Sequence, residues 1–95
     1  MTACVLRIHG RVQGVSYRAS LAAQAGRLGL KGWLRNRRDG TVEALLAGAD
    51  DALDALETWA WQGPPLARVT RVERQATAAQ PGGDLAEAFE TRPTV

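Results

Sequence analysis

The order in which two hydrophobic periodicities alternate along the chain is the feature that most restricts its fold. Residues 4–9 alternate apolar and polar side chains, which predicts a strand with one buried face. Residues 17–28 then place apolar side chains at helical spacing, and Gly29 follows where a helix C-terminal glycine belongs. A strand followed by a helix is therefore the first predicted unit.

The second unit begins with a hairpin. Residues 30–36 and 41–47 each predict a strand, and Asp39-Gly40 between them is a strong turn signal. Asp50–Gln62 predicts a second helix, whose first turns carry acidic side chains that suit the positive end of a helix dipole. The remaining segments predict a strand, a loop and an optional short fifth strand, over residues 68–75, 77–84 and 85–92.

This β-α-β-β-α-β order predicts an α/β fold, a ferredoxin-like sandwich in which an antiparallel sheet carries both helices on one face. The chain has 95 residues, enough for one hydrophobic core. We therefore expect a single domain over residues 1–95. The fold class by itself does not specify a function.

Composition excludes several classes of protein. No apolar stretch approaches the roughly 20 residues that a membrane span needs, and Arg7 and His9 interrupt the N-terminal run, unlike a signal peptide. One cysteine, Cys4, and one histidine make neither an internal disulfide nor a structural zinc site. We expect a cytoplasmic protein with no metal, no cofactor and no membrane partner.

Charge is distributed unevenly along the chain. Residues 1–38 carry eight basic side chains and no acidic one, whereas residues 39–95 carry four basic and ten acidic side chains. The net charges of +8 and −6 indicate either that the first part handles an anion or that the composition is biased toward arginine. The distribution alone does not decide between these readings.

A loop with two glycines, Gly10 and Gly14, joins the first strand to the first helix. Backbone N–H groups at a helix start are unpaired and attract anions, although glycines in a loop are also typical of ordinary turns. Arg18 favours an anion site, because a cation in the first helical turn opposes the dipole unless an anion lies beside it. We expect Ser16 to cap this helix.

This loop and the hairpin together resemble the signatures of the acylphosphatase family. The first signature is the run Gly10-Arg11-Val12-Gln13-Gly14-Val15-Ser16-Tyr17-Arg18, and the second spans residues 32–43. Residues 59–69 and 89–92 are similar to later parts of the family pattern. Tyr17 stands where the family more often has phenylalanine, and Ser16 where it often has glycine or another small residue. The resemblance covers nearly the whole chain.

The resemblance implies hydrolysis of an acyl phosphate to a carboxylate and inorganic phosphate, and it assigns Asn36 to orient the attacking water. A neutral amide suits this task, because the dianionic phosphoryl group would repel a carboxylate base. The carboxylate leaving group has a conjugate acid of pKa near ~4, so no general acid is needed. The phosphoryl group is expected to bind Arg18 and the backbone N–H groups of Arg11, Val12, Gln13, Gly14, Val15 and Ser16.

Strand parity supports a place for Asn36 near this loop. Asn36 shares parity with Leu30 and Leu34, so its side chain is expected on the helix-bearing face, near the start of the first helix. An asparagine before a hairpin is otherwise a common turn former. We expect Thr41 to support Asn36 from across the hairpin.

Two other functions stay open. A basic ferredoxin-like sheet binds RNA through exposed aromatic side chains on adjacent strands, and only Trp33 and Phe89 fall on predicted strands here. The anion loop also suits a ligand-binding or carbamoyl-phosphate-handling module of a larger assembly. The enzyme hypothesis predicts a small acyl phosphate as substrate, inorganic phosphate as product and weak inhibitor, no nucleic acid, and a monomer.

Overall fold

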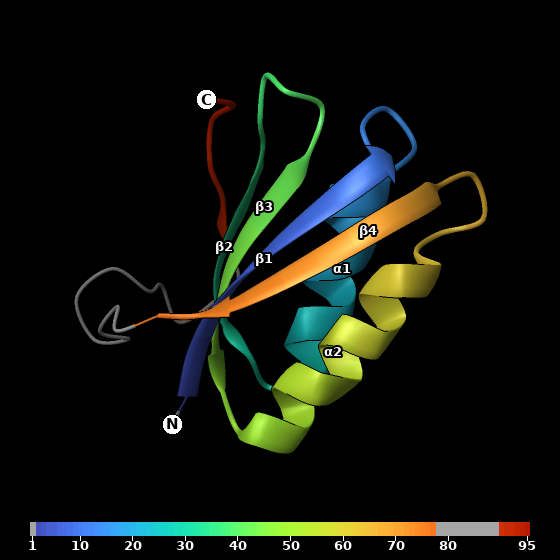
Figure 1. Ribbon diagram of the computed structural model, residues 1–95. Coiled ribbons are helices and arrows are strands. Elements are labelled where there is room, and N and C mark those ends of the chain that lie inside the picture. Colours follow the sequence, from blue (N-terminus) through green and yellow to red (C-terminus); the bar gives the residue numbers. More distant parts are fainter. Residues whose placement is uncertain (1, 78–89) are drawn as a thin grey trace.

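The computed structural model describes residues 2–77 and 90–95, which form a sheet layer and a helix layer (Figure 1). Their order confirms the predicted β-α-β-β-α-β pattern, with a short fifth strand added. Residues 78–89 of the predicted loop and optional strand lie outside the described residues. The elements are β1 (Thr2–Arg11), α1 (Tyr17–Arg27), β2 (Lys31–Asn36), β3 (Val42–Gly48), α2 (Asp50–Gln62), β4 (Arg68–Ala76) and β5 (Glu90–Thr91).

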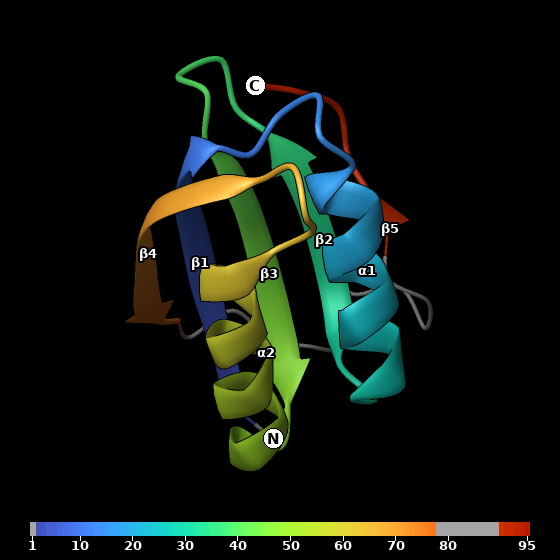
Figure 2. The ribbon, with the colours of Figure 1, turned by 90° about the vertical axis from the view of Figure 1, so that its right-hand side faces the viewer.

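The sheet has the strand order β4-β1-β3-β2-β5, and both helices cover the same face of it (Figure 2). β1 pairs antiparallel with β3 and β4, and β2 pairs antiparallel with β3, as predicted. β5 instead pairs parallel with β2 at the edge. Among the described residues, no helix is long and apolar enough to cross a membrane.

The core lies between the sheet and the helices. The inward positions predicted from the period-two and helical patterns are buried there, except Leu28 of the helical pattern, which is only partly buried against the core. The buried positions include Cys4, Leu6, Ile8, Tyr17, Leu21, Ala25, Leu34, Val42, Ala44, Leu46, Leu53, Leu56 and Ala60. Helix α1 ends at Arg27 with Leu28 as its C-cap, and Gly29 takes φ 71°, the left-handed conformation expected of a glycine after a helix.

Strand β3 differs from the alternating pattern, because all seven of its residues are buried. The strand lies between β1 and β2, so both of its edges are covered. On the face without helices, Glu43 accepts hydrogen bonds from Arg7, Arg35 and Arg37 at 3.3, 2.8 and 3.1 Å. The long arginine side chains shield this carboxylate from water in a way that the alternation of residue types does not reveal.

The topology brings two loops together. Because β1 and β2 both run antiparallel to β3, their C-terminal ends lie at the same end of the sheet. The β1–α1 loop and the β2–β3 hairpin therefore project side by side (Figure 2). The two segments that carried the sequence signatures meet at this end.

Candidate active site

A pocket of about 160 Å³ lies where β1 and β2 end. It brings Arg18, from the first turn of α1, into one site with Asn36, the last residue of β2, as strand parity predicts. Pockets for drug-sized ligands measure roughly 300–1,000 Å³, so this one suits a small group. Its lining residues are Val12, Gln13, Gly14, Ser16, Tyr17, Arg18, Ala19 and Asn36.

Two buried valines anchor the loop. Val12 and Val15 are 1% and 6% exposed and belong to the core, so the backbone between them is fixed at both ends. Four of the six loop residues predicted to bind phosphate line the pocket. The other two do not: Arg11 is the final residue of β1 and pairs with Arg68, and the side chain of Val15 points into the core.

Glycine plays a different structural role at each of the two loop positions. Gly10 has φ 119° and lies at an irregularity between β1 and β4, where a Cβ would come within 2.1 Å of the Arg68 carbonyl oxygen. Gly10 therefore serves strand geometry and does not line the pocket. Gly14 lines the pocket with φ 73°, and a Cβ there would meet nothing within 4 Å.

Ser16 does not cap α1 with its side chain, which corrects the prediction. Its backbone is left-handed, with φ 63° and ψ 23°, and its side chain makes no capping hydrogen bond. A side-chain cap normally requires an extended backbone at this position, and the left-handed backbone of Ser16 does not meet that requirement. Non-glycine residues in this conformation concentrate at functional sites.

Arg18 lies half-buried in the pocket, and in the described part of the chain its guanidinium makes no hydrogen bond or ion pair. The first turn of α1 contains no acidic residue. The cation and the positive end of the helix dipole therefore point at the same space, which favours an anion between them.

Asn36 presents an unsatisfied oxygen. Within the described residues its Oδ1 atom is buried and has no hydrogen-bond partner, a situation rare enough to require an explanation. Its backbone is held on both sides, by the pairing with Val42 and by Val95, whose N–H donates to the Asn36 carbonyl at 3.3 Å. The Val95 carbonyl in turn accepts the Arg38 N–H at 2.7 Å. Residues 93–95 thus run beside the segment that carries Asn36.

Thr41 lies in the hairpin but does not line the pocket. Its hydroxyl donates to Asp39 Oδ1 at 2.6 Å, and its N–H donates to the same oxygen at 3.0 Å. These two hydrogen bonds lower the pKa of Asp39. Any support that Thr41 gives to Asn36 passes through its carbonyl, which accepts the Arg37 N–H at 2.8 Å.

Sequence reasoning missed two lining residues, Tyr17 and Ala19, although their places on either side of Arg18 were a usable signal. The Tyr17 hydroxyl donates to the Ala60 carbonyl oxygen at 2.7 Å, and burial raises its pKa. Its ring packs against Trp59 with centroids 5.7 Å apart. Tyr17 therefore joins the two helices and its hydroxyl is already committed.

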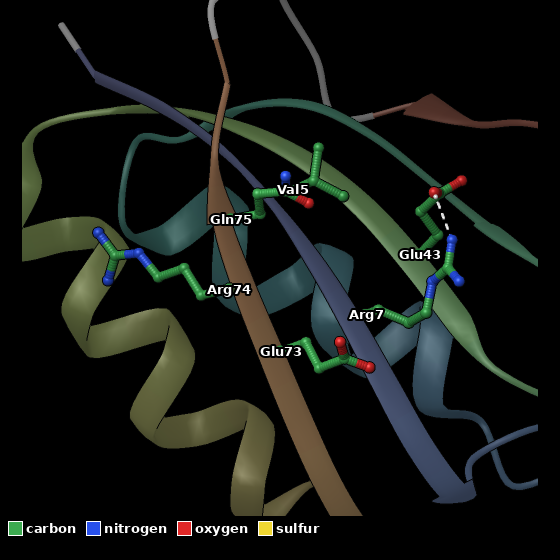
Figure 3. A pocket seen from close by; sticks show the side chains of 6 residues that line it. All are labelled: Val5, Arg7, Glu43, Glu73, Arg74 and Gln75. Carbon is green, nitrogen blue, oxygen red and sulfur yellow. Dashed lines mark hydrogen bonds and ion pairs between the residues drawn. The ribbon is translucent and has the colours of Figure 1, made fainter.

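A second pocket, on the face without helices, shows what is unusual about the first. Its volume is about 550 Å³, and its lining residues are Val5, Arg7, Glu43, Glu73, Arg74 and Gln75 (Figure 3). Its charged groups are paired: Arg7 with Glu43, Arg74 with two carboxylates of α2, and Glu73 with His9 and Arg71. The larger hollow thus has no spare cation, whereas the smaller pocket has one.

The small pocket also lacks groups that commonly titrate near neutral pH or bind metals. Among the described residues, its lining contains no carboxylate, histidine or cysteine. Elsewhere in residues 2–77 and 90–95, no three such side chains gather as a metal site requires. What the pocket offers is one guanidinium, one amide and the N-terminus of a helix, a combination that holds a phosphoryl group rather than a cation.

A ferredoxin-like sandwich with such a pocket belongs to the phosphoryl-binding proteins, and comparisons with known proteins identify which. The sequence model of the acylphosphatase family matches residues 4–90. The chain is 59% identical over 90 residues to an acylphosphatase of Acidovorax sp. (strain JS42), covering 95% of this chain and 89% of that protein.

Solved structures agree. The chain superimposes on an acylphosphatase from Bacillus subtilis with a TM-score of 0.88 at 30% identity, covering 97% and 99% of the two chains. It superimposes on one from Coxiella burnetii with a TM-score of 0.85 at 34% identity, covering 96% and 92%. The chain belongs to the acylphosphatase family. It is an enzyme of this class, which hydrolyses acyl phosphates to a carboxylate and phosphate, and the predicted resemblance, fold and activity are confirmed.

Proposed function

We propose that the enzyme hydrolyses its acyl phosphate by direct attack of water on a phosphoryl group held at the N-terminus of α1. Arg18 binds the phosphoryl oxygens and Asn36 orients the water. The observation that carries this proposal is the small pocket itself, which gathers Arg18, Asn36 and the glycine loop without any carboxylate in its lining. The substrate class is the acyl phosphates.

Phosphoryl binding follows from three convergent positive groups. The unpaired guanidinium of Arg18 grips two phosphoryl oxygens, the unpaired N–H groups at the start of α1 donate to the third, and the helix dipole adds to both. Loose phosphoryl-transfer transition states carry their charge on these same oxygens. The groups that bind the substrate therefore also stabilise the transition state.

Water activation falls to a neutral group. The unsatisfied Asn36 Oδ1 accepts a hydrogen bond from the attacking water and fixes the direction of its attack without repelling the dianion. The departing carboxylate needs no proton, because its conjugate acid has a pKa near ~4. The described residues that line the pocket include no carboxylate, imidazole or thiolate, so the water's proton passes to a phosphoryl oxygen of the substrate as the bond from phosphorus to the carboxylate oxygen breaks.

The same features support the remaining assignments. Trp33 is the described strand aromatic on the face without helices. The guanidinium groups of Arg35 and Arg92 lie 4.7 and 4.9 Å from its ring centroid, so they occupy the ring faces on which nucleic-acid bases would stack.

The large exposed hydrophobic residues of the described chain, Trp61, Leu66 and Val95, make no run in the sequence, which favours a monomer. Product phosphate is a weak inhibitor, and the buried free thiol of Cys4 suits the reducing cytoplasm.

Two substitutions test the proposal with benzoyl phosphate as substrate and a chelator present. Arg18→Ala is expected to lower kcat/KM by roughly 10²–10³-fold and to weaken inhibition by phosphate, because it removes a charge donor from the phosphoryl site. Asn36→Ala is expected to lower kcat by about 10²-fold and to leave phosphate inhibition nearly unchanged.

Arg27→Ala is the matched control, because Arg27 lies exposed in the last turn of the same helix and is expected to be dispensable. Full activity in both Arg18→Ala and Asn36→Ala would overturn the proposal. So would loss of all activity in the chelator.

A further inference from the structure

The side chain of Gln13 connects the phosphate loop to the hairpin that follows Asn36. Its Nε2 group donates to the Arg37 carbonyl at 2.7 Å and to the Thr41 carbonyl at 3.0 Å. An amide nitrogen carries two hydrogens, and both are used. Because carbonyl oxygens only accept hydrogen bonds, Nε2 rather than Oε1 must face them.

The two acceptors are the ends of a closed turn. The Arg37 N–H donates to the Thr41 carbonyl at 2.8 Å, and the Gly40 N–H donates to the Arg37 carbonyl at 3.0 Å. Gln13 therefore holds both ends of the hairpin at once. Arg37 is the residue next to Asn36, so the Gln13 hydrogen bonds end one residue from the amide that the mechanism uses.

Other contacts hold the two halves through the core and the sheet, where Val42 of β3 pairs with both Ile8 and Asn36. The buried Val12 and Val15 hold the loop in the core, and the β2–β3 pairing holds Asn36 in the sheet. Among the described residues, the two Gln13 bonds are the side-chain hydrogen bonds that join the loop to the hairpin. They join the loop beyond the end of β1 directly to the hairpin beyond the end of β2, which the strand pairing does not do.

We infer that the Gln13 side chain is a positioning residue, which sets Asn36 at the angle and distance from which it directs water at the bound phosphoryl group. This role is distinct from the backbone N–H groups of the loop, and it rests on the proposed function. Removing the tether leaves phosphate binding intact, because Arg18 and the helix N-terminus do not need the hairpin. Without the two Gln13 hydrogen bonds Asn36 is less firmly positioned, and a misplacement of about 1 Å in such a site costs up to roughly 10²-fold in rate.

The test is a double-mutant cycle between Gln13→Met and Asn36→Ala, with benzoyl phosphate as substrate and inorganic phosphate as inhibitor. Methionine keeps the length of the side chain and removes both donors. Alone, Gln13→Met is expected to lower kcat by roughly ten- to a hundredfold, with phosphate inhibition changed by less than about threefold. In the Asn36→Ala background the same change is expected to cost less than about twofold, because there is no amide left to position.

Gln75→Met is the matched control, because Gln75 is exposed on β4 and lines the other pocket. An unchanged kcat in Gln13→Met, or an equal loss with and without Asn36, would overturn the positioning role. If the loss of kcat in Gln13→Met is absent at temperatures below the variant's unfolding transition, Gln13 is a purely structural residue, and that result would also overturn the positioning role. Full activity of Asn36→Ala would overturn both this inference and the proposed role of Asn36. The results for Gln13→Met bear on this inference alone.

Discussion

Helices α1 and α2 follow strands in equivalent places of the fold, yet the sequence prepares their N-termini in opposite ways. The first turn of α2 carries Asp50 and Asp51, and its capping residue, Ala49, is extended with φ −69° and ψ 147°. The first turn of α1 carries no acid and contains Arg18, after the left-handed Ser16. One helix offsets its dipole with its own carboxylates, whereas the other adds a guanidinium to its positive end.

The comparison shows how a small fold marks its site. Both N-termini have free N–H groups, so the presence of a helix start does not distinguish them. The difference lies in the charge that the chain supplies: two carboxylates at α2, and an unpaired guanidinium beside a pocket at α1. A helix start that the sequence leaves uncompensated is therefore a better indication of an anion site than the glycines that precede it.

The strongest test gives α1 the kind of charge that α2 has. Ala19 is exposed, lies in the first turn of α1 and lines the pocket. Ala19→Asp is expected to lower kcat/KM by roughly ten- to a hundredfold, because a fixed carboxylate competes with the phosphoryl group for Arg18 and the dipole. The free energy of unfolding in urea is expected to stay level or to rise by about 0.3–1 kcal/mol.

Two variants control this experiment. Ala19→Asn has nearly the same shape without the charge and is expected to stay close to wild-type activity. Asp51→Asn at α2 is expected to do the reverse of Ala19→Asp, costing about 0.3–1 kcal/mol of stability with no change in rate. A fully active Ala19→Asp enzyme would place the phosphoryl site somewhere other than the N-terminus of α1.

The pH dependence of stability tests the paired charges of the sheet, which contrast with the unpaired guanidinium at the start of α1. Burial raises the pKa of Glu43, but hydrogen bonds and charges from Arg35 and Arg37 outweigh it, so its pKa is lowered from 4.5 overall. A lowered pKa means that this carboxylate stabilises the folded protein above the unfolded pKa. That stability is expected to be lost as the pH falls from 4.5 through the folded value.

The measurement is urea unfolding at a series of pH values, in wild type and in Glu43→Gln. At neutral pH we expect Glu43→Gln to cost about 1–3 kcal/mol and its loss of stability below pH 4.5 to be shallower than in wild type. An identical acid dependence in the two proteins would show that other carboxylates carry it.

The smallest expected effect comes from relieving the backbone at the start of α1. Ser16 adopts φ 63° without a capping bond, so Ser16→Gly is expected to raise the free energy of unfolding by roughly 0.5–1 kcal/mol, the left-handed cost less the added entropy of glycine. Thermal and urea unfolding measure it. A destabilised Ser16→Gly would mean that the serine side chain makes up for its own strain.

Most of the fold could be read from the sequence because its signals are local. Strand alternation, helical spacing and the glycine after α1 each reflect the chain within a few residues, and the structure follows them closely. Ser16 was misread because serine is a good cap only when its backbone is extended, and the loop sets a left-handed conformation instead. The burial of both faces of β3 needed its neighbours across the sheet to be known.

The residues of the candidate site also divide into those that local sequence indicates and those that only the tertiary structure reveals. Arg18 is visible in the sequence because it breaks a local rule for helix starts, and Asn36 follows from strand parity combined with the family resemblance. The Gln13 side chain was not visible, because it bonds to residues 24 and 28 positions away and its partners are backbone carbonyls that any residue type supplies. Sequence indicates which residues are chemically unusual, whereas the structure shows which ordinary ones hold them in place.

The position of β1 in the sheet also governs when the enzyme becomes complete during its synthesis. Of the described strands β1 is the first to leave the ribosome, but its two partners are β3 and β4, which end at residues 48 and 76. At about 5–20 residues per second, β1 waits seconds with at least one edge open to other chains. Until β4 emerges, the nascent chain carries the β1–α1 loop on a strand with one unpaired edge, which is open to pairing with other chains.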